Sequence, residues 1–400
     1  MLILNRRRFL QLGSLASAAT LMPQFLKALE RRPLAGAGNK VLVVVQLSGG
    51  NDGLNTIIPY RNDIYYRLRP SLSIKREDAL SLTDEEGIHP ALRSLKALYD
   101  NGDMALLQNV GYPNPDRSHF RSMDIWQTAS SSSDSWSNGW IGRYLDAQCN
   151  GCDHPTQALE MDDTLSLALK GASNNGLAFT DPNRLMGTSN DPFFKALQAQ
   201  HHTEDGHHNV EYLYKTMGET ISSASYISQQ FKTYQSKAAY PNTELGKHMR
   251  TIANLVMSDI NTKVYYVSHG SFDTHVGQQG QQQRLFGQLD DALDVFVQDL
   301  KANNRFQDVV IMTFSEFGRR VAQNASGGTD HGTANNMFLI SGALRQKGLL
   351  NPGPDLVNLL EGDLQYQVDF KSVYATLLNK WLGADDRAIL QQQYPHLDFV

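Results

Sequence analysis

The sequence predicts an α/β fold built on a large, mostly parallel sheet flanked by helices. Three short apolar runs rich in β-branched residues are typical of strands buried on both faces: Val41–Leu47, Val264–Ser268 and the first half of Val309–Arg320. Each run stops abruptly in polar residues, and helical stretches precede the last two. This alternation of helix and strand favours a parallel sheet. Ligands of such sheets bind beyond the carboxyl ends of the strands, where these polar residues lie.

The elements of the first part of the chain follow in order. After the first strand we expect a helix over His89–Asp100, whose apolar positions recur at helical spacing, and a strand over Asp103–Val110. Prolines then break the chain before Ser118, which occupies the N-cap position of a helix that runs to about Ala129. The serine-rich loop Ser130–Trp140 should be largely exposed.

The remaining elements extend the sheet and cover it. Weaker patterning over residues 153–240 indicates an insertion or cap, with short strands around Gln157–Ala168 and helices around Pro192–Gln200 and Val210–Ser236. Beyond it, the periodicity predicts two helices, a strand and a closing amphipathic helix, in this order: Asn242–Ile260, Gln279–Asn303, Met337–Gly342 and Asp369–Leu382.

The N-terminus carries an export signal. Arg6-Arg7-Arg8-Phe9-Leu10 precedes a modestly apolar run, and no acidic residue occurs before Glu30, which is the twin-arginine signal pattern. We expect residues 1–37 to be a signal peptide read by the twin-arginine export machinery, residues 38–400 to form the α/β domain, and the protein to be periplasmic or secreted. An ordinary basic amphipathic helix is the alternative. The run is too short and interrupted for a membrane span, so we expect no integral membrane protein.

Composition excludes some classes of partner. Of the 400 residues 19% are charged and the formal net charge is -5, so no strong positive field points to nucleic acid. The two cysteines, Cys149 and Cys152, lie three positions apart. They fit a small disulfide loop, a redox pair or part of a metal site, and the sequence leaves these alternatives open.

Two motifs combine a carboxylate with an imidazole. In Asp273-Thr274-His275 the two functional side chains project to the same side of an extended backbone and can reach one cation. Asp330 and His331 are flanked by glycines that let the backbone approach a ligand closely. These motifs predict a metal site, and the alternatives are a turn capped by Asp273 and a purely structural glycine turn.

Two further carboxylates follow strand ends. Glu316 could ligate a metal, while Arg319 and Arg320 clamp an anionic substrate through charge-assisted contacts. Asp52 follows a glycine-rich loop that could form an anion nest or a metal platform. The alternatives are a solvated helix start for Glu316 and a simple strand-to-helix turn for Asp52.

Ser118 is the candidate nucleophile. At a helix N-terminus its hydroxyl lies where free N–H groups favour anions, and a bound cation would lower its pKa. Plain N-capping is the alternative. Its neighbour His119 is a candidate acid or substrate contact, and Arg117 is a candidate partner for the charge of the substrate.

With these residues assembled, the chain resembles the domain of unknown function 1501 family of twin-arginine-exported proteins, which belongs to the alkaline phosphatase and sulfatase superfamily. The resemblance rests on QLSGGNDGLNTIIPY, HPAL, VGYPNPDRSHF, GWIGRYLD, SFDTH, TFSEFGRR and GTDHGTA. It implies an alkaline-phosphatase-like α/β fold, one or two divalent metal ions (zinc, calcium, magnesium or manganese) and a nucleophile at a helix N-terminus.

By position, the resemblance implies that Ser118 is the nucleophile and that five residues match metal ligands: Asp52, Asp273, His275, Glu316 and His331. Two departures bear on the ligand set. The usual wider spacing between Asp and His is here Asp273-Thr274-His275, and the usual adjacent Asp-His pair is here Glu316-Phe317. These departures leave three alternatives open for the ligand set. It holds one metal ion, it holds a metal other than that of the superfamily, or it holds none. Ser118 also lacks the local motif that a formylglycine requires.

The sequence thus predicts an exported, metal-dependent hydrolase of phosphate or sulfate esters that acts on a small anionic ester or a surface glycan. Ser118 attacks the ester, and Arg117, Arg143 or Arg319 neutralises the charge of the substrate. A catalytically silent binding or scaffold protein on the same fold is the second hypothesis. A phosphoglycerate-mutase-like transferase is the third.

Overall fold

The computed structural model describes residues 40–148, 156–192 and 208–400. Residues Lys40–Val400 form one compact unit. The expected signal peptide, Cys149, Cys152 and nearly all of the helix expected at Pro192–Gln200 lie outside the described residues. No helix among the described residues has the length and apolar character needed to cross a membrane.

Three parallel strands form the centre of the main sheet. Strand β1 (Val41–Leu47) lies between β8 (Val264–His269) and β9 (Val309–Phe314) and pairs with both in parallel. All residues of β1 and β9 are buried, since helices cover both faces. The apolar runs therefore became buried parallel strands, as the sequence predicts, and their carboxyl ends meet at one edge of the sheet.

One strand of the sheet runs against its neighbours. Strand β10 (Asn335–Ile340) pairs antiparallel with β9 on one side and with β5 (Met104–Gly111) on the other. Its antiparallel direction, which the helix–strand rhythm did not predict, makes β5 parallel to β9. The start of β10 consequently lies at the same edge as the ends of β1, β5, β8 and β9, so the loop before β10 can join the loops that follow those strands.

Short strands complete the main sheet in the order β11-β5-β10-β9-β1-β8-β6-β7, with β12 paired to β5. These short strands are β6 (Ala158–Glu160), β7 (Leu177–Ala178), β11 (Gly348–Leu349) and β12 (Val368–Asp369). The segment expected as an insertion, residues 153–240, thus supplies two strands to the sheet before α8 (Pro182–Ser189) and α10 (His208–Phe231). A second, three-stranded sheet consists of β2 (Ile57–Ile58), β3 (Leu80–Ser81) and β4 (Gly87–Ile88).

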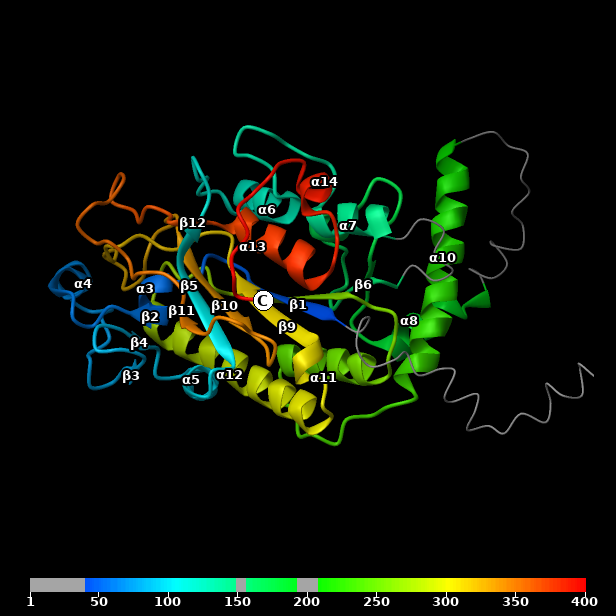
Figure 1. Cartoon of the computed structure of the whole chain (residues 1–400), viewed down its shortest axis with the longest axis horizontal. Coiled ribbons are helices and arrows are strands. Elements are labelled where there is room, and N and C mark those ends of the chain that lie inside the picture. Colours follow the sequence, from blue (N-terminus) through cyan, green and yellow to red (C-terminus); the bar gives the residue numbers. More distant parts are fainter. Residues whose placement is uncertain (1–39, 149–155, 193–207) are drawn as a thin grey trace, which may run out of the picture. The chain divides into compact units, whose positions relative to one another are not determined.

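Helices cover both faces of the main sheet (Figure 1). One layer consists of α5 (Arg93–Asp100), α11 (Glu244–Met257) and α12 (Gln278–Ala302), and the opposite layer of α6 (His119–Thr128), α7 (Trp140–Gln148), α13 (Phe370–Thr376) and α14 (Asp386–Leu390). Alternate residues of β1 serve the two cores: Val43 and Val45 pack in one, Leu42 and Val44 in the other. The short helices α3 (Gly53–Thr56) and α4 (Asp63–Leu68) follow β1.

One local expectation was confirmed and one was wrong. The loop Ser130–Trp140 is largely exposed, as expected, and only its two ends are buried, where Trp140 begins α7 and stacks on Tyr374. The helix expected as amphipathic over Asp369–Leu382 has every residue of α13 buried and continues as a π-helix over Leu377–Trp381. This error arises because tertiary packing covers a segment whose local pattern resembles that of a surface helix.

Candidate metal centre

The loops at the carboxyl edge of the sheet bring seven polar residues together. His119 begins α6 after β5, Asp273 and His275 follow β8, Glu316 and Arg319 follow β9, and Asp330 and His331 precede β10. An antiparallel backbone bridge joins Arg319 to His331, and Arg320 donates its N–H to the carbonyl of Asp330 over 3.0 Å. The segment after β9 and the segment before β10 therefore lie side by side at this edge.

Glu316 orients His119 and is not itself aimed at the centre. Its Oε1 lies 2.8 Å from Nδ1 of His119 and accepts the backbone N–H of Gly49 over 2.9 Å. The carboxylate is 1% exposed, and its Oε2 lies 3.4 Å from Ser315 Oγ. Because a carboxylate can only accept, Nδ1 of His119 carries the hydrogen and Nε2 presents a lone pair.

The other two histidines have the same arrangement. Nδ1 of His331 lies 2.8 Å from the backbone carbonyl oxygen of Arg117, and Nδ1 of His275 lies 3.3 Å from Oδ1 of Asp330. Both partners are acceptors, so each Nδ1 donates and each Nε2 is left as an acceptor. Metal-binding histidines are held in this way, with one ring nitrogen donating to a carboxylate or carbonyl and the other facing the ion.

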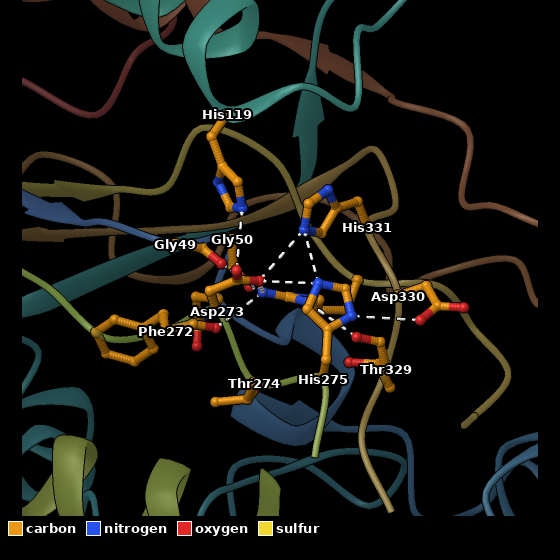
Figure 2. A network of polar contacts seen from close by, with 12 residues as sticks. Gly49, Gly50, His119, Phe272, Asp273, Thr274, His275, Thr329, Asp330 and His331 are labelled. Atoms are coloured by element: carbon orange, nitrogen blue, oxygen red, sulfur yellow. Dashed lines mark hydrogen bonds and ion pairs between the residues drawn. The ribbon is translucent and has the colours of Figure 1, made fainter. Parts of the chain in front are cut away.

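The three Nε2 atoms converge on Asp273 (Figure 2). Its Oδ1 lies 3.0 Å from Nε2 of His275 and 3.2 Å from Nε2 of His331, and its Oδ2 lies 3.5 Å from Nε2 of His119. The Nε2 atoms of His275 and His331 are 3.0 Å apart. Ligand atoms of His119, Asp273 and His331 all lie within 4.8 Å of one another, which is compatible with one bound ion.

The donor set fits a divalent metal ion. Nε2 of His119 is buried and has no hydrogen-bond partner. A buried lone pair without a donor costs free energy, whereas a cation between His119, His331 and the carboxylate satisfies all three groups. His275 contacts Asp273 and His331 at 3.0 Å and is a candidate fourth ligand. Three imidazoles and one carboxylate are ligands typical of zinc and similar transition metals, while magnesium and calcium prefer oxygen.

Arg319 holds Asp273 in place. Its guanidinium is completely buried and donates to Oδ1 of Asp273 over 2.8 Å. The remaining donors bind the backbone carbonyls of four residues, namely Gly49, Gly50, Phe272 and Thr329. All three guanidinium nitrogens are thereby engaged, so Arg319 positions the carboxylate and joins three loops. The sequence suggested that Arg319 contacts an anionic substrate, but in the structure its guanidinium is buried and bonded to the protein itself.

The electrostatics of the cluster keep Asp273 ionised. Partial burial raises the pKa of Asp273, but the hydrogen bond and the charge of Arg319, together with the neighbouring histidines, outweigh it and lower the pKa to about 2. The hydrogen bond to Glu316 raises the pKa of His119, whereas burial lowers the pKa of His331. The hydrogen bond from Asn324 and the neighbouring His275 lower the pKa of Asp330. The carboxylates therefore remain available as anions for a metal or a charged imidazole.

Asp52 has a structural role. It is 1% exposed, pairs with Nη1 of the fully buried Arg69 over 2.6 Å and accepts the backbone N–H of Leu54 as the N-cap of α3. The side chain of Gln278 also donates to it. Its carboxylate is therefore committed to an ion pair and a helix cap, and we leave Asp52 out of the proposed ligands.

Ser118 stands between two residues that contact the histidine cluster. The carbonyl of Arg117 accepts from His331, and the ring of His119 belongs to the cluster. Ser118 is the N-cap residue of α6, as the sequence predicts, but its side chain makes no capping hydrogen bond and is exposed. Its N–H donates instead to Oδ1 of Asp116 over 2.7 Å. The hydroxyl therefore has no structural task at the helix start.

The remaining arginines expected to face a substrate have internal partners. Arg117 pairs with Asp363 at 2.5 Å and with Glu361 at 3.4 Å. Arg143 is buried on α7 and donates to backbone carbonyls, including that of Thr128 over 2.6 Å. Neither guanidinium is left free to neutralise an anionic substrate.

Two features of the site have no signal in the sequence. Arg69, which binds Asp52, lies in a segment without a motif, and Asp363, which binds Arg117, lies in a polar loop. The sequence also did not place His119 in the cluster with Asp273 and His331, because beside Ser118 it was expected to be an acid or a substrate contact. A histidine one position inside a helix that follows a strand end is the only hint that the sequence offers for a ligand there.

Comparisons with known proteins complete the description of the site. The model of the family described as "Protein of unknown function (DUF1501)" matches residues 102–350. A search of curated proteins finds no match.

Similar solved structures include members of the alkaline phosphatase and sulfatase superfamily. A protein in the alkaline phosphatase superfamily from Vibrio parahaemolyticus has 10% identity and a TM-score of 0.40, with 89% of this chain and 69% of that chain covered. The PsFucS1 sulfatase from Pseudoalteromonas sp. has 9% identity and a TM-score of 0.40, with 94% and 72% covered. The C-terminal periplasmic domain of EcEptC from Escherichia coli, in complex with Zn, has 11% identity and a TM-score of 0.35, with 78% and 76% covered.

Because these TM-scores are below 0.5, we draw no conclusion about substrate or reaction from the solved structures. The family match is of a different kind, since it extends over more than half of the sequence. The chain therefore belongs to the DUF1501 family.

Proposed function

We propose that this protein is a metal-dependent hydrolase of phosphate or sulfate esters. The observation that carries the proposal is the convergence of three histidine Nε2 atoms on the carboxylate of Asp273, beside an exposed serine at a helix start. The candidate ligands are His119, Asp273, His275 and His331. Glu316 and Asp330 act as the partners of His119 and His275, and Arg319 positions Asp273.

A bound divalent ion would supply positive charge to the ester oxygens and lower the pKa of a nearby hydroxyl. The bond changes of the reaction take place at Ser118. Ser118 forms the new bond from Oγ to phosphorus or sulfur while the bond from that atom to the alcohol oxygen breaks. The serine proton leaves to solvent, the departing oxygen takes a proton from solvent, and water then releases phosphate or sulfate from the serine.

The metal is tested first, by elemental mass spectrometry of the full chain. We expect bound metal in the parent and in Ser118→Ala, and none in a His119→Ala, His331→Ala double variant. Imidazole-rich ligand sets favour zinc and similar ions. A parent that stays without metal after reconstitution would sink the proposal.

Turnover of phosphate and sulfate monoesters is tested next. Ser118→Ala should lower kcat/KM by at least about 1,000-fold with unchanged metal content, because it removes the nucleophile alone. The matched control is Ser137→Ala, which changes another exposed serine, in the loop before α7. Equal turnover by Ser118→Ala and the parent would rule out the serine mechanism.

A second candidate function is an exported binding or scaffold protein. The observation that favours it is the internal pairing of Arg117, Arg143 and Arg319, which leaves none of these three cations free to bind an anionic ester. Metal retention without turnover of any monoester would support this second function over hydrolysis.

We also propose that the protein acts outside the cytoplasm. The support is the arginine pair Arg6-Arg7 and the apolar run that follows it. An Arg6→Lys, Arg7→Lys variant should stay in the cytoplasmic fraction while the parent leaves it. Equal export of the two chains would contradict the twin-arginine route.

A further inference from the structure

A cleft with a volume of about 470 Å³ adjoins the candidate metal centre. Two of its lining residues connect it with that centre. The backbone carbonyl of Arg117 accepts from Nδ1 of His331, and Thr333 follows His331 by two positions. Ser118, the proposed nucleophile, is the next residue after Arg117. A group held in the cleft would therefore lie next to the reacting ester.

The lining of the cleft combines apolar and aromatic side chains with polar groups in nearly equal measure. It includes six side chains with broad apolar faces: Tyr112, Pro113, Pro115, Leu360, Leu364 and Tyr366. Asn114, Thr333 and Gln365 add uncharged polar groups. Flat apolar faces interspersed with amides and hydroxyls suit a ring that bears hydroxyl or other neutral polar groups, and a cavity of this volume accepts a small organic molecule.

Exposed large hydrophobic side chains occur on the same segments. Among the described residues, the large hydrophobic side chains that are exposed are Phe120, Val276, Val357, Leu360 and Tyr366. Phe120 and Val276 follow the candidate ligands His119 and His275 in the chain, and the other three belong to the loop that supplies the cleft. Two of these exposed side chains, Leu360 and Tyr366, line the cleft itself and offer apolar surface to a ligand there.

The cleft has no free positive charge. Arg117 is the one cation among its lining residues, and Asp363 and Glu361 bind it at 2.5 Å and 3.4 Å. Glu361 is itself part of the lining. Arg320, which is not part of the lining, also lies 4.0 Å from Asp363 and donates to the backbone carbonyl of Glu361. Within the lining a further anionic group on the ligand would find no unpaired cation and would meet Glu361.

Resting on the proposed ester hydrolysis, we propose that this cleft binds the alcohol portion of the substrate and selects an uncharged, ring-bearing alcohol. The metal centre takes the phosphate or sulfate group, and the cleft takes the ring. Neutral sugar rings and aryl groups share this chemistry. Esters of highly charged glycans are disfavoured, because the cleft offers their additional anionic groups no cation.

Kinetics with three esters test the choice of alcohol. The parent should hydrolyse benzyl and glucose 6-esters with at least about tenfold higher kcat/KM than a methyl ester, since an additional ring buries apolar surface and all three leaving groups are alkoxides. A preference for the benzyl ester or for the sugar ester identifies which source of ring the cleft accepts. Equal kcat/KM for all three esters would overturn the proposal while leaving the hydrolase function intact.

A charge substitution tests the location. Leu360→Arg places a cation at the cleft, and Val357→Arg makes the same change on the same loop outside its lining; the two side chains are 62% and 73% exposed in the parent, so both variants should fold. Leu360→Arg should tighten the binding of 4-hydroxybenzoate by about threefold to fivefold, which is the range of exposed ion pairs, and Val357→Arg should not.

Isothermal titration measures this binding without any turnover, so it remains informative if no ester is hydrolysed. Binding of 4-hydroxybenzoate that is unchanged in Leu360→Arg, or strengthened equally in both variants, would overturn the location. Absence of metal and of turnover, with the expected binding difference retained, would reject the hydrolase function and keep the cleft as a binding site.

Discussion

Oε1 of Glu316 lies 2.8 Å from Nδ1 of His119, in a position where the carboxylate is buried and also accepts the N–H of Gly49. The residue that the sequence suggested as a metal ligand therefore fixes the tautomer of His119, which was expected to be an acid or a substrate contact. The same relation recurs between Asp330 and His275 at 3.3 Å. Each of these two carboxylates thus accepts a hydrogen bond from a histidine that is a proposed metal ligand.

Glu316→Gln should weaken metal binding without unfolding the protein. The substitution keeps the shape but removes the charge that stabilises the donating Nδ1 of His119, and loss of such a partner typically costs about 10- to 100-fold in metal affinity. Competition with a chelator measures the affinity. The control is Glu361→Gln, which changes a carboxylate that contacts Arg117 and none of the proposed ligands. Equal affinities of the two variants would contradict this role.

Asp52 and Asp273 should respond to substitution in opposite ways. Asp52→Asn leaves the buried Arg69 without its ionic partner and should lower the free energy of unfolding by roughly 3–5 kcal/mol, with metal content retained. Asp273→Asn should abolish metal binding, because the carboxylate lies at the centre of the cluster. Chemical denaturation and elemental analysis of both variants measure the two effects. Loss of metal in folded Asp52→Asn would return Asp52 to the ligand set.

Two adjacent glycines allow a test of the loop before β10. A Cβ on Gly328 would lie 2.3 Å from the carbonyl carbon of His275, so Gly328→Ala must displace the loop that carries this proposed ligand. Gly327 has a φ of +69°, and a Cβ on it would meet no other atom within 4 Å, so Gly327→Ala costs only backbone strain, about 1–2 kcal/mol.

We therefore expect weaker metal binding in Gly328→Ala and nearly unchanged metal binding in Gly327→Ala, measured by the same chelator competition. Thermal unfolding of both variants separates a general loss of stability from a displaced ligand. Identical metal affinities in the two variants would show that His275 does not contribute to the centre.

Glu160 should make the protein less stable at high pH. Burial beside the sheet raises the pKa of Glu160 to about 7, although the backbone N–H of Ser166 donates to it over 2.7 Å. The folded state therefore holds a proton that the unfolded chain releases near pH 4.5. Stability falls as the pH rises from that value to about 7, by an amount on the order of 3 kcal/mol.

Glu160→Gln removes this ionisation, so the variant should gain stability relative to the parent as the pH rises from about 5 to about 8. Urea denaturation at several pH values measures the difference, and the exposed Glu85→Gln serves as the control. A difference between Glu160→Gln and the parent that does not change over this range would contradict the raised pKa.

The sequence by itself determined the central strands and the edge at which the site lies. Continuous apolar runs require burial on both faces, and in this chain the polar residues that follow them carry most of the chemistry. Asp273, His275 and His331 could be selected in this way, because each lies in a short motif that combines a carboxylate with an imidazole. The helix start at Ser118 was likewise predictable from local backbone chemistry.

Only the tertiary structure decided which partner each of these groups has. Hydropathy records burial but not pairing, so the antiparallel direction of β10, which brings His331 to the same edge, has no signature in the pattern. Whether a carboxylate binds a metal, a histidine or an arginine depends on what packs against it from a distant part of the chain. Asp52 pairs with Arg69, and Glu316 pairs with His119. In both cases the packing of distant segments places beside the carboxylate a stronger partner than any residue near it in the sequence.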